Sequence, residues 1–127
     1  MKTIILDTSF LIACAEFRID YLSEFERIFT TQYTVSAPDI VINELKTLAD
    51  KGTARQKQAS KLAQTILCRK NIQVIKTPEA KTADQAILSI ANKDTVVATI
   101  DAELKRMLKN KKVALIVVRQ KKYLIML

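Results

Sequence analysis

Hydrophobic residues in this sequence fall into short continuous runs that alternate with longer amphipathic stretches. Three mostly apolar runs, at 3–6, 95–100 and 113–118, have the pattern of strands buried on both faces of a sheet. Weaker β-type runs occupy 33–36 and 71–75. Helical spacing predicts helices at 10–13, 20–29, 38–49, 53–67, 82–92 and about 104–112. The alternation predicts an α/β fold with a central parallel sheet of about five strands, covered by helices on both faces.

The length of the chain sets the scale of this fold. At 127 residues it fits one domain, 1–127, which buries roughly two thirds of the unfolded surface. The longest apolar runs are far shorter than the ~20 residues that cross a bilayer, and the first residues do not form a signal-peptide pattern. Two isolated cysteines, Cys14 and Cys68, are too few for a disulfide framework or a zinc site. We therefore expect a cytoplasmic protein with no membrane partner.

The net charge and the absence of histidine limit the functions that the chain can have. The sequence contains no histidine, which excludes Ser-His and Cys-His hydrolases and the usual transition-metal sites. The formal net charge of +8 indicates a polyanionic partner, with nucleic acid as the first candidate. The alternative is a lysine-rich surface that serves only solubility.

Four acidic residues stand out by position. Asp7 and Asp101 directly follow predicted strands, Asp84 opens a predicted helix, and Glu44 lies within an apolar helical stripe. The carboxyl ends of parallel strands meet at one edge of the sheet, so these acids converge if the first and fourth strands are neighbours. Each acid also has an ordinary interpretation. Asp7 and Asp101 suit helix caps, Asp84 suits a helix dipole, and Glu44 suits a solvated edge.

Taken together, the acids predict a cation site. Several carboxylates at one edge raise each other's pKa unless a cation compensates their charge. Oxygen ligands without histidine favour a hard ion, Mg²⁺ or Mn²⁺. Such a site in a basic protein suits attack of water on a phosphodiester, while lysines and arginines hold the polyanion.

The residues that carry these features resemble the PIN domain family along essentially the whole chain. They are Ile5-Leu6-Asp7-Thr8-Ser9, then Pro38 with Glu44-Leu45, then Thr82-Ala83-Asp84, and finally Val97-Ala98-Thr99-Ile100-Asp101 with Leu104. The ending 117–122 is similar to archaeal members related to the ribosome-processing nuclease subgroup, and VapC-type toxins share the same core. The resemblance implies a three-layer α/β/α PIN-like fold with a parallel sheet, Mg²⁺- or Mn²⁺-dependent endoribonuclease activity, and frequent homodimers.

The resemblance also implies roles for individual residues. Catalysis and metal binding fall to Asp7, Glu44, Asp84 and Asp101. Thr8, Ser9 and Thr99 match the polar residues that orient the acids. Glu103 stands where some members have a further acid, although a glutamate in the first turn of a helix also suits the helix dipole. Ile100 departs from the family, because many relatives carry Asn there.

Basic residues crowd the last quarter of the chain. We expect RNA contacts from six of them: Lys105, Arg106, Lys109, Arg119, Lys121 and Lys122. The alternative is a solvated helix face and ending. The aromatic residues Tyr21, Phe25 and Phe29 serve either a dimer contact or the core.

The sequence thus predicts an endoribonuclease, either a VapC-type toxin or an RNA-processing nuclease. Its partners would be RNA, a second copy of the chain, and an antitoxin or a ribosome-assembly factor. The alternative is a catalytically weak or inactive PIN-like module that binds RNA or serves assembly.

Overall fold

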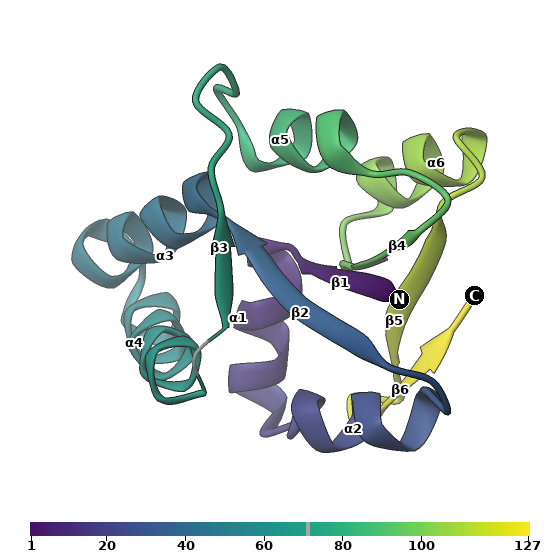
Figure 1. Cartoon of the computed structure of the whole chain (residues 1–127). Helices are drawn as coiled ribbons and strands as arrows, with labels where there is room; N and C mark the ends of the chain where they lie inside the picture. The colour runs from purple at the N-terminus through teal and green to yellow at the C-terminus, as the bar shows by residue number, and fades with distance from the viewer. Residues whose placement is uncertain (71) are drawn as a thin grey trace.

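The computed structural model describes residues 1–70 and 72–127 and places strands and helices in alternation (Figure 1). In chain order the elements are β1 (Lys2–Leu6), α1 (Thr8–Phe17), α2 (Tyr21–Ile28), β2 (Tyr33–Pro38), α3 (Asp39–Lys51), α4 (Ala54–Arg69), β3 (Gln73–Ile75), α5 (Ala83–Ile90), β4 (Thr95–Ala98), α6 (Ala102–Asn110), β5 (Ala114–Arg119) and β6 (Tyr123–Met126). The third strand was predicted from residue 71, but Asn71 lies outside the described residues.

One sheet runs through the middle of the molecule. Its strand order over the described residues is β3-β2-β1-β4-β5-β6, with β6 antiparallel to β5 and the other pairs parallel. β1 and β4 are therefore neighbours, with Leu6 paired to Ala98 in the register between them. This places the end of β1 beside the end of β4, which is the arrangement that the acidic pattern required.

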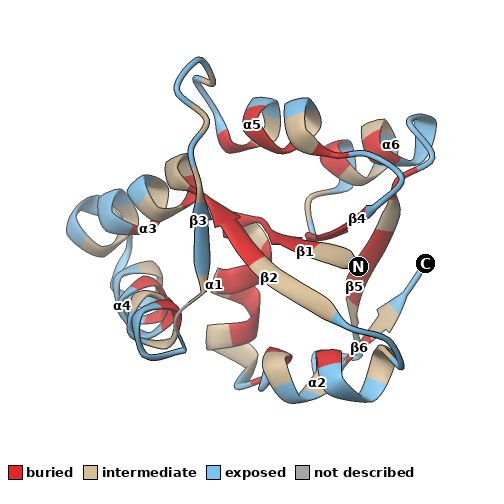
Figure 2. Cartoon of the chain, in the orientation of Figure 1, coloured by how far each residue is buried: buried red, intermediate tan, exposed pale blue. Residues whose placement is uncertain are grey.

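Helices cover both faces of the sheet, so the predicted α/β class and its three layers are confirmed (Figure 1). On one face, Ile4 and Leu6 of β1 join a core with Phe10 of α1 and Phe25 of α2. On the other face, Ile5 packs in a second core with side chains of α5 and α6. Between these cores, β4 is buried along its whole length, and β1 and β2 are buried over their carboxyl-terminal halves, as Figure 2 shows. This burial on both faces explains why their sequences read as continuous apolar runs.

The predicted aromatic cluster belongs to this core. Tyr21 and Phe25 are buried, and their rings lie 5.7 and 6.2 Å from the ring of Phe10. Phe29 is partly buried and packs on Tyr33 at 5.1 Å. Of the two roles left open by the sequence, these side chains take the core.

The sheet contains a strand that the sequence analysis missed. β6 returns from β5 through a tight turn closed by the Lys122 N–H, which donates to the Arg119 carbonyl oxygen at 3.0 Å. Both central residues of the turn, Gln120 and Lys121, have positive φ (53° and 57°), the pattern of a type I′ hairpin. Such turns usually carry Asn-Gly, and an L residue in this conformation costs roughly 1–2 kcal/mol. Because the turn lacks that signature, the sequence analysis did not predict a hairpin in the charged end of the chain.

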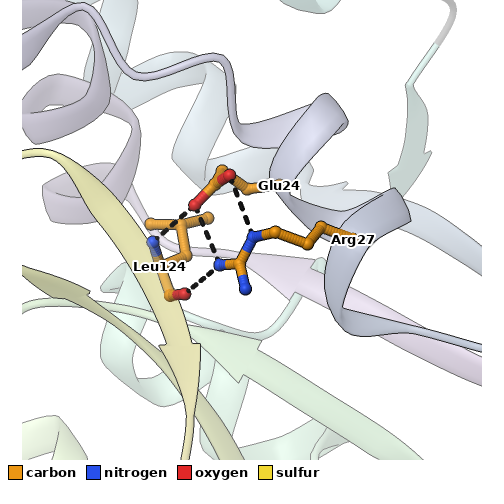
Figure 3. A network of polar contacts seen from close by, with 3 residues as sticks. All are labelled: Glu24, Arg27 and Leu124. Atoms are coloured by element: carbon orange, nitrogen blue, oxygen red, sulfur yellow. Dashed lines mark hydrogen bonds and ion pairs between the residues drawn. The ribbon is translucent and has the colours of Figure 1, made fainter.

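Helix α2 covers the outer edge of β6 (Figure 3). The Leu124 N–H donates to Glu24 Oε1 at 2.8 Å, and Arg27 Nη2 donates to the Leu124 carbonyl oxygen at 2.6 Å. Arg27 also pairs with Glu24 at 3.0 Å. These contacts satisfy backbone groups that an uncovered edge strand would present to other chains.

The turn between α3 and α4 contains Gly52, the single glycine of the chain. An added Cβ at this position would lie 2.6 Å from the Leu48 carbonyl oxygen, so the turn requires glycine.

Among the described residues, none of the helices has the length and apolar character needed to span a bilayer.

Candidate active site

Asp7 lies at the carboxyl end of β1 and is almost completely buried, with 3% of its surface exposed. Its backbone N–H donates to the Ala98 carbonyl oxygen of β4 at 3.0 Å, which continues the sheet pairing one residue further. Asp7 occupies the N-cap position of α1, yet its side chain accepts no capping hydrogen bond. The simple helix-cap interpretation is therefore wrong for Asp7, and a buried carboxylate needs other partners.

Two hydroxyl groups supply those partners. Oδ2 of Asp7 accepts from Ser9 Oγ and from Thr99 Oγ1, each at 2.7 Å. The two hydroxyl oxygens lie 3.2 Å apart, and Thr99 is fully buried. Thr99 Oγ1 also accepts from the Asp101 N–H at 3.1 Å, so the Thr99 hydroxyl links Asp7 after β1 to the backbone of Asp101 after β4. Ser9 and Thr99 thus fix the orientation of Asp7, in the way that supporting hydrogen bonds fix a ligating carboxylate.

Glu44 of α3 reaches the same place from another segment. The buried Thr8 hydroxyl donates to Glu44 Oε1 at 2.6 Å, so α1 and α3 are linked beside Asp7. Glu44 is half-buried, while Val41 and Leu45 on the same helix lie in the core. Because Glu44 lies in the apolar stripe of α3, its side chain lies on the side of the helix that faces the other three acids.

Asp101 and Asp84 complete the group. Asp101 Oδ1 caps α6 by accepting from the Leu104 N–H at 2.9 Å, so its helix-cap interpretation is correct. Asp84 lies in the first turn of α5 and is half-buried. Burial raises the pKa of the Asp84 carboxyl above its ordinary value. The other causes that raise this pKa are negative charges, from Asp7, Asp101, Glu44 and Glu103.

The four predicted acids line one cleft of ≈ 520 Å³. Its other lining residues come mainly from one face of α1 and from the facing starts of α4 and α5. They are Thr8, Ser9, Ile12, Ala13, Glu16, Phe17, Leu48, Gln56, Thr82, Ala83 and Ile100. In the described part of the chain, no lysine or arginine lines this cleft. Its negative charge is therefore not neutralised by a basic side chain within it.

The donor chemistry of the cleft fits a hard divalent cation. Its acidic and hydroxyl side chains offer oxygen only, and the pKa of Asp84 is raised first by burial and then by the negative charge of the neighbouring carboxylates. Within residues 1–70 and 72–127, no three Asp, Glu or Cys side chains are placed to enclose an ion on their own. Mg²⁺ commonly binds through one or two carboxylates, with water and substrate phosphate filling the remaining positions. The residues fit such an open site better than a closed cage of protein ligands.

The remaining predicted residues lie outside the cleft. Glu103 is exposed and paired with Arg106, and this hydrogen bond lowers the pKa of Glu103. Lys105 is half-buried, and Lys109, Arg119 and Lys122 are exposed. Lys121 is also exposed, but its Nζ lies 5.5 Å from the ring centroid of Phe17, which lines the cleft.

Several residues of the cleft were not predicted as part of the site, among them Glu16 and Phe17. Glu16 is a fifth acid, and its carboxylate pairs across the cleft wall with Arg55 of α4 at 3.8 Å. The signal was present, because Ser9, Ala13 and Glu16 follow one another at helical spacing along the face of α1 that carries the site.

Comparisons with known proteins agree on one family. Residues 4–121 match the family described as PIN like domain. The chain is 33% identical over 125 residues to Ribonuclease VapC4 of Methanocaldococcus jannaschii, and the match covers 97% of this chain and 95% of that protein.

Solved structures show the same fold. The structure of the PIN domain endonuclease Utp24 matches with a TM-score of 0.75 and 22% identity, over 98% of this chain and 90% of that chain. A domain of a functionally unknown protein from Methanocaldococcus jannaschii matches with a TM-score of 0.63 and 17% identity, over 94% and 92% of the respective chains.

Proposed function

The chain belongs to the PIN-like domain family, and on that premise we propose that it is a metal-dependent endoribonuclease that hydrolyses RNA phosphodiester bonds. The observation that carries the proposal is that Asp7, Glu44, Asp84 and Asp101, from four separate segments, line one cleft. The relative named Ribonuclease VapC4 supports RNA as the substrate. The formal charge of +8 suits a polyanion as well.

The four acids are the proposed catalytic and metal-binding residues. The chemistry that Mg²⁺ or Mn²⁺ supplies when bound is acidification of water and compensation of the negative charge on the phosphate. The chain's own contribution is to hold the carboxylates in place. Ser9 and Thr99 fix Asp7, and Thr8 fixes Glu44. Fixed orientations of this kind lower the reorganisation that the reaction requires.

Asp101 and Glu103 act differently from Asp7 in this proposal. Because one oxygen of Asp101 caps α6, the helix itself holds this carboxylate at the edge of the cleft. Glu103 is an auxiliary acid that contributes charge only, since it is exposed and engaged with Arg106.

The basic surface outside the cleft is the proposed contact for the rest of the RNA. Its residues are Lys105, Arg106, Lys109, Arg119, Lys121 and Lys122. Contacts of this kind go to phosphates, so they position a strand without reading its sequence. A lysine inside the cleft would form ion pairs with the acids. The six basic residues do not line the cleft.

Two biological settings fit this activity: a VapC-type toxin controlled by an antitoxin, and an RNA-processing nuclease associated with ribosome assembly. The relative's name favours the first setting. We also propose that the protein is cytoplasmic and forms a homodimer, and light scattering on the purified protein tests the dimer directly. A small reading frame for an antitoxin beside the gene would support the toxin setting.

A cleavage assay tests the proposed activity. Purified protein is incubated with structured RNA in Mn²⁺, in Mg²⁺ or in excess chelator. We expect cleavage that requires the metal and that falls at least about a hundredfold in Asp84→Asn, because one carboxylate of the site is lost. The matched control is Asp50→Asn, which makes the same change at an exposed position of α3 outside the cleft.

The outcomes separate the two functions that the sequence left open. Cleavage lost in Asp84→Asn and kept in Asp50→Asn supports the nuclease. RNA binding without cleavage, equal in both variants and in the wild-type protein, contradicts it and supports a non-catalytic RNA-binding module.

A further inference from the structure

The far end of the cleft brings together an aromatic ring and a lysine from distant parts of the chain. Phe17 is the last residue of α1 and lines the cleft about 12 Å along the helix from Ser9, given a rise of 1.5 Å per residue. Lys121, at the tip of the β5–β6 hairpin, lies with its Nζ 5.5 Å from the Phe17 ring centroid. This distance is within the range of a cation–π contact.

The fold directs the hairpin tip to this side of the molecule. β5 is parallel to β4 and β4 to β1, so Arg119 at the end of β5 lies on the same edge of the sheet as Asp7 and Asp101. The turn keeps Gln120 and Lys121 at positive φ although neither is glycine or asparagine. Unfavourable backbone of this kind persists where the surrounding structure holds it, and it is concentrated at functional sites.

Lys121 is distinguished from the other basic residues of the chain ending. Among the six predicted RNA-binding residues, Lys121 is the one that makes a cation–π contact with a side chain that lines the cleft. Arg106 is engaged by Glu103. No acid among the described residues pairs with Lys121, so its ammonium can accept an anionic partner.

We propose that the Lys121 ammonium, seated on the Phe17 ring, binds a backbone phosphate of the RNA strand away from the phosphate that is cut. The strand then runs along α1 from the acids to the hairpin tip. Phe17 is a positioning residue that acts through Lys121. This inference rests on the proposed function for the direction of the strand, but the phosphate contact itself is a binding property that can be measured without cleavage.

Binding in excess chelator is the main test. A short fluorescein-labelled oligouridine is titrated with protein at several salt concentrations, and affinity is read from fluorescence anisotropy. We expect Lys121→Gln to weaken binding about three- to fivefold. The slope of log affinity against log salt should fall by about 0.7, the value for one phosphate contact to a single strand.

Matched variants separate this site from general charge. Lys112→Gln removes the same charge from the turn that precedes β5, at the opposite edge of the sheet, and should leave the affinity and salt slope close to wild type. Phe17→Leu should reproduce the effect of Lys121→Gln, whereas Phe17→Tyr keeps the aromatic ring and should retain wild-type binding. Thermal melting confirms that each variant is folded.

The results distinguish this inference from the proposed function. With Mn²⁺, Lys121→Gln should raise KM for RNA about as much as it weakens binding and leave kcat unchanged. Equal binding by Lys121→Gln and Lys112→Gln overturns the site at Lys121, and wild-type binding by Phe17→Leu overturns the role of the ring. A wild-type protein that binds RNA but does not cleave it contradicts the nuclease and leaves the binding comparison to decide the phosphate site.

Discussion

The substitution Thr99→Val tests the hydrogen bonds that hold the most buried acid. Thr99 is fully buried, and its hydroxyl donates to Asp7 Oδ2 at 2.7 Å and accepts from the Asp101 N–H at 3.1 Å. Valine has nearly the same shape and an equal preference for strand-like backbone, but it can make neither bond. The change therefore leaves a carboxylate that is 3% exposed with one donor fewer.

The size of the effect follows from these two bonds. A hydrogen bond to a charged group contributes about 1.5–3 kcal/mol, and a neutral one contributes about 1 kcal/mol. We expect Thr99→Val to lower the free energy of unfolding by about 2–4 kcal/mol. For a chain of this length that corresponds to a fall in Tm of roughly 10 °C.

Urea unfolding followed by circular dichroism measures this change. The control is Thr34→Val, which removes a neutral side-chain contact of 3.3 Å to Thr3 on a neighbouring strand and should cost no more than about 1 kcal/mol. The cost of Thr99→Val should shrink by more than about 1 kcal/mol in an Asp7→Asn background, because the charge is then absent. Equal costs in both backgrounds, or a Thr99→Val protein as stable as Thr34→Val, would refute the assignment of Thr99 as the partner that stabilises Asp7.

Three further predictions concern the stability of the fold. Tyr21→Phe should raise the free energy of unfolding by up to about 1–2 kcal/mol in urea titrations, because the buried Tyr21 hydroxyl has no hydrogen-bond partner among the described residues. The hydrogen bond from Arg27 lowers the pKa of Glu24 below 4.5, so the stability that this carboxylate contributes is complete above that pH and is lost as the pH falls below it. Glu24→Gln should therefore flatten the dependence of the free energy of unfolding on pH in the acid range, as measured by urea titrations at several pH values. Gln120→Gly should raise Tm by a few degrees in calorimetry, since it relieves positive φ by up to ~1 kcal/mol, and a fall in Tm would show that the turn is not strained.

The sequence predicts the placement of the acids where local pattern and topology act together. Asp7 and Asp101 each follow a run of apolar residues, and parallel strands bring such ends to one edge. Glu44 was recognisable because a carboxylate within an apolar stripe needs a partner, and Thr8 provides it. The prediction that these acids meet depended on β1 and β4 being neighbours, which the sheet order confirms.

Other features could not be predicted from local patterns in the sequence. The Asp7, Ser9 and Thr99 group joins residues that are 92 positions apart, and hydroxyls carry no spacing signal of their own, so Ser9 and Thr99 were named only through the resemblance to the PIN domain family. β6 was missed because its turn lacks the Asn-Gly signature. Phe17 belongs both to the core edge and to the cleft, so its apolar character alone gave no reason to separate these roles.

The separation of charge in this molecule has a physical rationale. A chain of charge +8 carries a cleft that no lysine or arginine of the described residues lines. A basic side chain among the acids would form ion pairs with them and compete with a divalent cation for the same oxygens. The length of α1 from Ser9 to Phe17, about 12 Å, exceeds the Debye length of about 8 Å at physiological ionic strength. In our proposal Lys121, which forms no ion pair with an acid of the described residues, attracts a phosphate at the far end of α1, so that one face of a single helix carries both the acids and the phosphate contact.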